Sequence, residues 1–187
     1  MFFNAFRQVG KDLFLAGLNN SHSGNLSVRL NEKQMVITRT GCMLHHIAQS
    51  DLITTAIRHE DYQTLKASRE LPVHRSIYLH TKAKAIVHAH SPHVIAESLN
   101  GNHIENNRLM LKDAEGLYYF PKGIFVIEAK NAIASNEVAE LVIPAFKDSP
   151  IVIVKGHGVF SIGENLEEAY HWVTGLEHST KILKLLE

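Results

Sequence analysis

One continuous stretch decides how this chain folds, and it reads Glu70-Leu-Pro-Val-His-Arg-Ser-Ile-Tyr-Leu-His-Thr-Lys-Ala-Lys-Ala-Ile-Val-His-Ala-His-Ser-Pro-His93. Apolar residues at helical spacing predict a helix over residues 71–81. Residues 85–90, Ala-Ile-Val-His-Ala-His, predict a short strand. Ser91 followed by Pro92 predicts the start of a second helix, with serine as the N-cap and proline at the first helical position. The strand therefore ends beside a turn into a helix, at the point where its two histidines lie.

His88 and His90 are two residues apart on this predicted strand, so both side chains project from the same face. Two imidazoles held in this way can share a metal ion if a third ligand comes from elsewhere in the chain. The candidate is His157, because its neighbours Gly156 and Gly158 let the backbone approach closely. Three histidines with an open fourth position are the arrangement that catalytic zinc uses. The alternative is a chance pairing, since the chain contains 13 histidines.

Composition restricts the class of protein. The 187 residues fit one domain, 1–187, in which 45% of the residues are apolar and 20% are charged, as in globular proteins that dissolve in water. Lys plus Arg equal Asp plus Glu at 19 each, so no basic surface argues for a nucleic-acid partner. Cys42 is the only cysteine, which excludes an internal disulfide and favours a cytoplasmic location. We expect neither a signal peptide nor contact with a membrane.

Strand and helix patterns are mixed along the chain without regular alternation. This mixture favours an α/β protein of the α+β type, with a central, mostly antiparallel sheet and helices on both faces, over a doubly wound parallel sheet. Besides the segments above, we expect strands at residues 26–30, 34–38, 52–57, 108–112, 123–128, 151–154 and 159–162, and helices at 3–16, 92–99, 135–146 and 165–186.

Other polar residues suggest proton transfer and anion binding. Glu70 stands just before a predicted helix, whose dipole would stabilise the carboxylate and make it a base. An ordinary solvated glutamate is the alternative. Gly24-Asn25 and Thr40-Gly41 lie in predicted turns, and Ser68 precedes a helix. Free backbone N–H groups and hydroxyls in such places suit a phosphate, although each segment alone is more commonly a plain turn.

Six short segments, spread over nearly the whole chain, form an ordered signature. They are Gly24-Asn25-Leu-Ser-Val-Arg29, Thr38-Arg-Thr-Gly41, Glu70-Leu-Pro-Val-His74, His88-Ala-His90, Gly156-His157-Gly158 and Glu167-Glu168-Ala169. In this order they resemble the class II aldolase/adducin family. The resemblance implies the fold of that family, and it implies that the three histidines hold one Zn²⁺ per chain.

The resemblance also implies roles for individual residues. Glu70 would act as the catalytic acid/base, and Tyr119 would reach the active site of a neighbouring subunit in a homotetramer with shared sites. His74, four residues after Glu70, is expected either to support Glu70 or to pack in the core. Where the family has a second phosphate-binding serine, this chain has Arg69, which places a cation next to the anion. Substrate phosphate would be bound by Gly24, Asn25, Thr40, Gly41, Ser68 and Arg69.

The activity that the resemblance implies is that of a zinc-dependent aldolase, a lyase that cleaves a short ketose 1-phosphate to dihydroxyacetone phosphate and an aldehyde. Dehydratases of methylthioribulose 1-phosphate share the fold and stay open as an alternative, whereas the related sugar-phosphate epimerases have Asp in place of Glu70. A non-haem iron oxygenase is disfavoured because the next acid, Glu97, comes too late in the chain. A non-enzymatic, adducin-like interaction module would not need the three histidines and Glu70 together. The expected partner is a small sugar phosphate.

Overall fold

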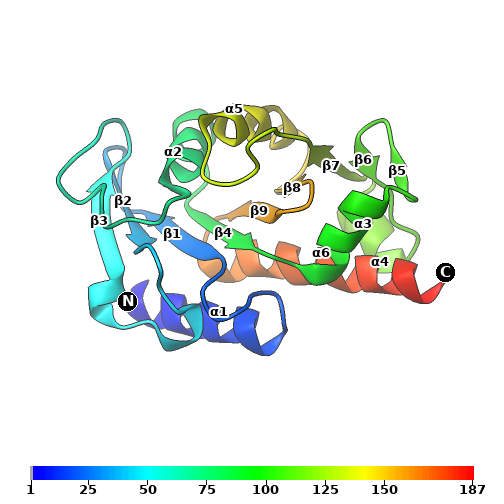
Figure 1. Cartoon of the computed structure of the whole chain (residues 1–187), viewed down its shortest axis with the longest axis horizontal. Coiled ribbons are helices and arrows are strands. Elements are labelled where there is room, and N and C mark those ends of the chain that lie inside the picture. Colours follow the sequence, from blue (N-terminus) through cyan, green and yellow to red (C-terminus); the bar gives the residue numbers. More distant parts are fainter. Residues whose placement is uncertain (1) are drawn as a thin grey trace.

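The computed structural model describes residues 2–187, and its centre is a nine-stranded sheet (Figure 1). The strand order is β3-β2-β1-β4-β9-β8-β7-β6-β5. Neighbouring strands pair antiparallel except β7 and β8, which are parallel. This confirms the predicted mostly antiparallel sheet. The strands are β1 (Asn25–Arg29), β2 (Gln34–Thr38), β3 (Leu52–Ala56), β4 (Ala85–Ala89), β5 (Ile104–Glu105), β6 (Arg108–Leu109), β7 (Ile124–Ile127), β8 (Ile151–Val154) and β9 (Gly158–Gly163).

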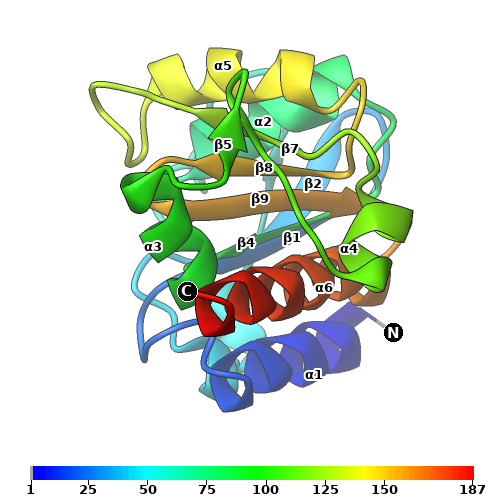
Figure 2. The same cartoon turned by 90° about the vertical axis from the view of Figure 1, so that its right-hand side faces the viewer.

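Helices cover both faces of the sheet, as predicted (Figure 2). One face carries α1 (Phe2–Leu15), α3 (Pro92–Asn100), α4 (Ala114–Tyr119) and α6 (Leu166–Leu185), and the other carries α2 (Leu71–His80) and α5 (Asn136–Ala145). Each layer encloses its own cluster of buried apolar side chains. No helix of residues 2–187 is long and apolar enough to cross a membrane.

The alternation of side chains along β4 connects this architecture to the histidines. Ala85, Val87 and Ala89 pack into the core on the side of α1 and α6, whereas Ile86 packs on the side of α2 and α5. Because strand side chains alternate between faces, His88 lies on the same side as Ile86, toward α2 and α5. The histidine therefore faces the layer in which Glu70 precedes α2.

The start of α3 differs from the prediction. Ser91 is the N-cap residue, but its side chain makes no capping hydrogen bond, and its hydroxyl is buried without a partner among residues 2–187. The capping acceptor is the carboxylate of Glu177 on α6, which accepts from the backbone N–H groups of His93 and Val94, each at 3.3 Å. Glu177 also bonds the His93 side chain, with Oε1 2.6 Å from Nδ1. A residue distant in sequence thus replaces the local cap.

Most predicted elements are found with ends shifted by at most one residue, but the segment before β7 is different. The strand expected at 108–112 is shorter and pairs with β5 in a hairpin. Asn106 and Asn107 both have positive φ, 50° and 60°, as the type I′ turn of a two-residue hairpin requires. Tyr119 ends α4, a helix that was not expected, whose N-cap Asp113 accepts from the N–H of Gly116 at 3.0 Å. Two short 3₁₀ helices, Leu44–His46 and Gln49–Asp51, were also not expected.

Candidate active site and metal centre

The three histidines expected to bind metal lie together at the end of β4 and the start of β9. Their ring centroids are 4.8–4.9 Å apart, and one nitrogen from each ring lies within 4.8 Å of the others. The Nε2 atoms of His88 and His90 are 3.1 Å apart. Ligand nitrogens on a tetrahedral zinc ion, at bond lengths of 2.0–2.1 Å, are separated by about 3.3 Å. The spacing therefore suits two nitrogens that direct their lone pairs at one cation.

Burial keeps these imidazoles neutral, which is the form that binds a metal. Burial lowers the pKa of all three histidines, and the mutual repulsion of the cluster lowers the pKa of His88 and His90 further, that of His90 to about 4. The Nδ1–H of His88 donates to the carbonyl of Val159 at 2.9 Å, which leaves Nε2 free as a ligand. The Nδ1 of His157 is buried without a hydrogen-bond partner among the described residues. This donor set fits a divalent metal ion.

Glycine is required at the position after the third histidine. A Cβ atom on Gly158 would lie 2.3 Å from the carbonyl oxygen of Ala89, at the end of β4. Gly156, on the other side of His157, has φ of +69°, a conformation that glycine adopts readily. The backbone of β9 can approach β4 this closely only without a side chain at position 158, and this approach places His157 against the other two rings.

Glu70 is the N-cap residue of α2, and it is buried rather than solvated. Its Oε1 lies 3.8 Å from Nε2 of His157 and accepts from the backbone N–H of Ala134 at 3.0 Å, while Oε2 has no partner within residues 2–187. Ala134 has φ of +53°, a rare conformation for a non-glycine residue that is often found at functional sites. Burial raises the pKa of Glu70, against the opposing effects of the Ala134 N–H and Arg69. We expected the dipole of α2 to lower the pKa of Glu70; the pKa is raised instead, because burial has the larger effect.

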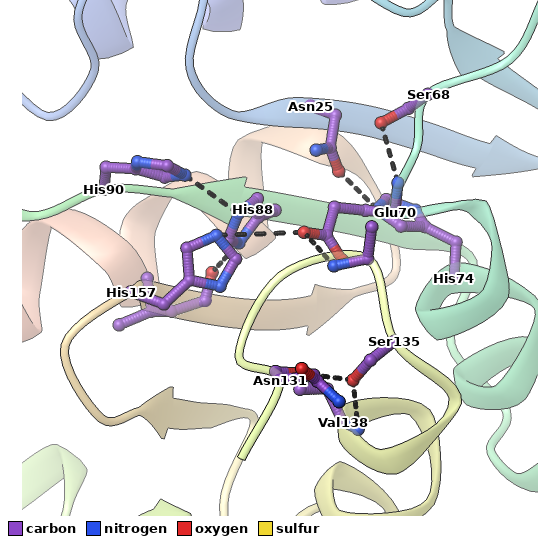
Figure 3. A network of polar contacts seen from close by, with 12 residues as sticks. Asn25, Ser68, Glu70, His74, His88, His90, Asn131, Ser135, Val138 and His157 are labelled. Atoms are coloured by element: carbon purple, nitrogen blue, oxygen red, sulfur yellow. Dashed lines mark hydrogen bonds and ion pairs between the residues drawn. The ribbon is translucent and has the colours of Figure 1, made fainter. Parts of the chain in front are cut away.

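One cavity of about 460 Å³ joins the metal-binding cluster to the segments predicted to bind phosphate. Figure 3 shows Asn25 and Ser68 on the same side of Glu70, with His88 and His90 beside them. Ser68 Oγ accepts from the N–H of Glu70 at 3.2 Å, so its own hydrogen is available to a ligand. The predicted site residues that line the cavity are Gly24, Asn25, Thr40, Gly41, Ser68, Arg69, Glu70, His88, His90 and His157.

Tyr119 does not line this cavity. It packs at the end of α4 against the rings of His171 and Trp172 on α6, with centroids 5.1 and 5.7 Å away. Its role toward a neighbouring chain stays a prediction. Glu97, the acid considered for an iron site, also lies outside this cavity. It is on α3, where its carboxylate lies 2.8 Å from Nδ1 of His103.

Two polar residues near the site had roles that the sequence did not reveal. Asn19, in the loop between α1 and β1, accepts the backbone N–H of His90 at 3.0 Å through its side-chain oxygen. His74 bonds neither oxygen of Glu70; instead its ring nitrogens each lie 2.6 Å from a polar atom of β1, the side-chain oxygens of Asn25 and Ser27. These contacts join residues far apart in sequence, so no local sequence pattern predicts them.

Comparisons with known proteins agree with this arrangement. The pattern of the class II aldolase and adducin N-terminal domain family matches residues 4–183. The crystal structure of L-fuculose-1-phosphate aldolase from Thermus thermophilus is similar with a TM-score of 0.88 and 36% identity, covering 98% of this chain and 92% of that chain. An L-fuculose phosphate aldolase of Methanococcus maripaludis is 30% identical over 152 residues, which are 79% of this chain and 76% of that protein.

Relatives with other names are nearly as similar. A methylthioribulose-1-phosphate dehydratase of Acidiphilium cryptum is 28% identical over 183 residues, with 90% of this chain and 83% of that protein covered. A 3-oxo-tetronate 4-phosphate decarboxylase of Haemophilus influenzae is 26% identical over 181 residues, with 96% and 85% covered. Similarity alone therefore does not select one reaction. Because the family pattern spans almost the entire chain, and the fold and histidine cluster accompany it, the protein belongs to the class II aldolase and adducin N-terminal domain family.

Proposed function

We propose that this protein is a zinc-dependent aldolase that cleaves a short ketose 1-phosphate to dihydroxyacetone phosphate and an aldehyde. The observation that carries the proposal is the single cavity in which a three-histidine cluster, a buried glutamate and several anion-binding groups meet. The similarity to fuculose-phosphate aldolases supports the same assignment. Zinc held by His88, His90 and His157 would polarise the carbonyl and hydroxyl oxygens of the substrate.

The chain itself supplies positioning and proton transfer. The hydroxyl of Ser68 and the amide of Asn25 face the cavity as donors for the phosphate group, and Arg69 on the rim adds a positive charge. This contact would place the carbon next to the phosphate-bearing end of the substrate within reach of Glu70. Burial raises the pKa of Glu70, which makes this carboxylate a stronger base and suits it to move a proton to and from carbon.

The reaction also needs a second proton transfer, to or from the oxygen on the carbon at which the C–C bond breaks. In the direction of aldol addition, Glu70 removes a proton from the carbon of dihydroxyacetone phosphate, and Tyr119 of a neighbouring subunit protonates the aldehyde oxygen; cleavage reverses both transfers. Tyr119 lies outside the cavity of its own chain, partly buried at the end of α4 and next to the exposed Tyr118. A homotetramer with shared sites is therefore part of the proposal.

A dehydratase is the second candidate, because a methylthioribulose-1-phosphate dehydratase is 28% identical to this chain and the match covers 90% of it. Arg69, in place of the second phosphate-binding serine of the family, would change how either enzyme holds the anionic end of its substrate. Either enzyme would use the same metal site and the same glutamate as acid/base. The two differ in products, because a dehydratase releases water and leaves the carbon chain intact.

Metal analysis tests the metal site that both functions share, and a substrate screen decides between the two reactions. We expect about one zinc ion per chain, and release of dihydroxyacetone phosphate from at least one short ketose 1-phosphate. Methylthioribulose 1-phosphate serves as the competing substrate. Loss of water from that compound, with no dihydroxyacetone phosphate formed from any ketose 1-phosphate, would replace the aldolase with the dehydratase.

A further inference from the structure

A chain of hydrogen bonds runs from the core to the cavity through four buried side chains. Tyr78 Oη lies 2.8 Å from Ser27 Oγ, Ser27 Oγ lies 2.6 Å from His74 Nδ1, and His74 Nε2 lies 2.6 Å from Asn25 Oδ1. His74 and Tyr78 are four residues apart on α2, and Asn25 and Ser27 are two apart on β1, so each pair shares one face of its element. Their exposed fractions are at most 5%.

The direction of donation along this chain follows from its buried end. Burial lowers the pKa of His74 to about 3 and raises that of Tyr78, so the imidazole is neutral and the phenol keeps its hydrogen. Within residues 2–187, Ser27 is the hydrogen-bond partner of the Tyr78 hydroxyl, so that hydrogen is donated to Ser27. Ser27 then donates to Nδ1 of His74, and the remaining ring hydrogen, on Nε2, is donated to Asn25. The opposite direction would leave a buried hydroxyl hydrogen without an acceptor, which is costly.

This direction determines what Asn25 offers to the cavity. Its carbonyl oxygen is occupied by His74, so its NH₂ group is the part left for a ligand. Figure 3 shows the amide nitrogen turned away from His74, and it has no hydrogen-bond partner among the described residues. An amide NH₂ donates and does not accept. The cavity at this point therefore suits an oxygen that carries lone pairs and negative charge.

We propose that His74 is a positioning residue: backed by Ser27 and Tyr78, it locks the Asn25 amide as a donor toward the phosphate group of the substrate. This assignment rests on the proposed function, in which the cavity receives a phosphate ester. Without this series of hydrogen bonds, the Asn25 amide can rotate and present its oxygen, which repels a phosphate oxygen. The selectivity of the site for an anion thus originates three side chains away, in the core between α2 and β1.

Inorganic phosphate is the probe, titrated calorimetrically into the zinc-loaded, full-length protein. His74→Leu keeps the apolar volume and removes the donor to Asn25; we expect phosphate affinity to fall roughly tenfold, as for one lost hydrogen bond to a charged ligand. His74→Gln, which retains an N–H donor, should recover part of this loss. Ser27→Ala is a small change that removes the hydroxyl between Tyr78 and His74, so that nothing fixes which nitrogen of His74 carries the proton; it should also weaken phosphate binding. Ser161→Ala, at a buried position in β9, should not weaken it.

Two further measurements separate positioning from folding and from the proposed function. Zinc content should be unchanged in every variant, and long-range ¹H–¹⁵N spectra of the wild-type protein should show the His74 proton on Nε2. Asn25→Ala tests the phosphate site itself: wild-type affinity in that variant would overturn both the phosphate site and the role of His74. Weakened binding in Asn25→Ala but wild-type binding in both His74→Leu and Ser27→Ala would overturn the positioning role alone. If His74→Leu does not fold, Ser27→Ala and the position of the His74 proton decide the question.

Discussion

His90 offers a test at the scale of single residues, because its backbone and side chain are held separately. Its backbone N–H donates to Leu18 and Asn19, each at 3.0 Å, and neither bond involves the imidazole. We therefore expect His90→Ala to lose bound metal and activity while remaining folded, since a three-ligand zinc site does not survive with two. His59→Ala, which removes an exposed histidine outside the cavity, should keep both.

Elemental analysis of the purified variants measures this outcome, with circular dichroism to check folding. Equal metal content in wild-type and His90→Ala proteins would place the metal elsewhere. Spacing predicted that His88 and His90 share one face, because the two-residue period of a strand is a local property. His157 was proposed as the third ligand only from its flanking glycines. The role of His74 could not be predicted, since its partners Asn25 and Ser27 lie 49 and 47 residues away.

The low pKa of His74 also predicts how stability depends on pH. An unfolded chain protonates this histidine below about pH 6.5, whereas burial holds the folded-state pKa at about 3. Between these values the unfolded state binds the extra proton, so the free energy of unfolding falls as pH falls, by up to about 1.4 kcal/mol per pH unit from this residue. Above about pH 6.5 both states are neutral and the effect disappears.

Urea unfolding of the metal-free protein, compared with the metal-free His74→Gln variant, isolates this contribution. The wild-type free energy of unfolding should fall more steeply than that of the variant as the pH is lowered from about 6.5 to 5. His88 and His90 titrate in both proteins, so their effects cancel in the difference. Parallel curves for the two proteins would mean that His74 is protonated in the folded state.

At the scale of elements, local periodicity predicted the strands and long helices well and the start of α3 only in part. Ser91 occupies the predicted N-cap position, yet the acceptor is Glu177, which lies 84 residues after His93. A sequence pattern detects a cap supplied by the residue itself, but not one supplied by another helix. The helix α4 was missed for a related reason, because Gly116 weakens its helical propensity and packing against α6 stabilises it.

Replacing Ser91 and Glu177 separately distinguishes the local cap of α3 from the acceptor supplied by α6. Glu177→Ala should lower the free energy of unfolding by about 1–2 kcal/mol, because two N–H groups at the start of α3 lose their acceptor. Ser91→Ala should change it by less than about 0.5 kcal/mol, because that hydroxyl makes no hydrogen bond to any of residues 2–187. Chemical denaturation of both variants gives the two values. A larger loss for Ser91→Ala would restore serine as the functional cap.

At the scale of the whole molecule, the sheet and the loops around it bring together residues from five separate segments. The meeting of Asn25, Thr40, Ser68, His88 and His157 around one cavity was expected through a family resemblance; the periodicity of each segment by itself does not place it next to the others. Tyr119 is the exception, because it lies outside this cavity. If it acts at all in the reaction, it acts in the cavity of another chain, and that consequence is open to test.

Two inactive variants provide the test. Glu70→Gln keeps the hydrogen bond from Ala134 but removes the base, so proton exchange at the carbon of dihydroxyacetone phosphate should fall roughly a hundred- to ten-thousand-fold with zinc retained. Tyr119→Phe should spare this exchange and slow C–C cleavage, because the tyrosine acts on the leaving oxygen.

Mixing the two variants tests whether Glu70 and Tyr119 of one active site come from different chains. If each site takes Glu70 from one chain and Tyr119 from its neighbour, random exchange of subunits gives roughly a quarter of the sites both native groups. Cleavage activity should therefore recover to about that fraction of the wild-type value, measured after mass spectrometry has shown that subunits exchange. A protein that stays monomeric in solution, or mixed oligomers that remain inactive despite exchange, would show that Tyr119 does not complete a neighbouring site, because no other arrangement of the two variants can restore both groups to one cavity.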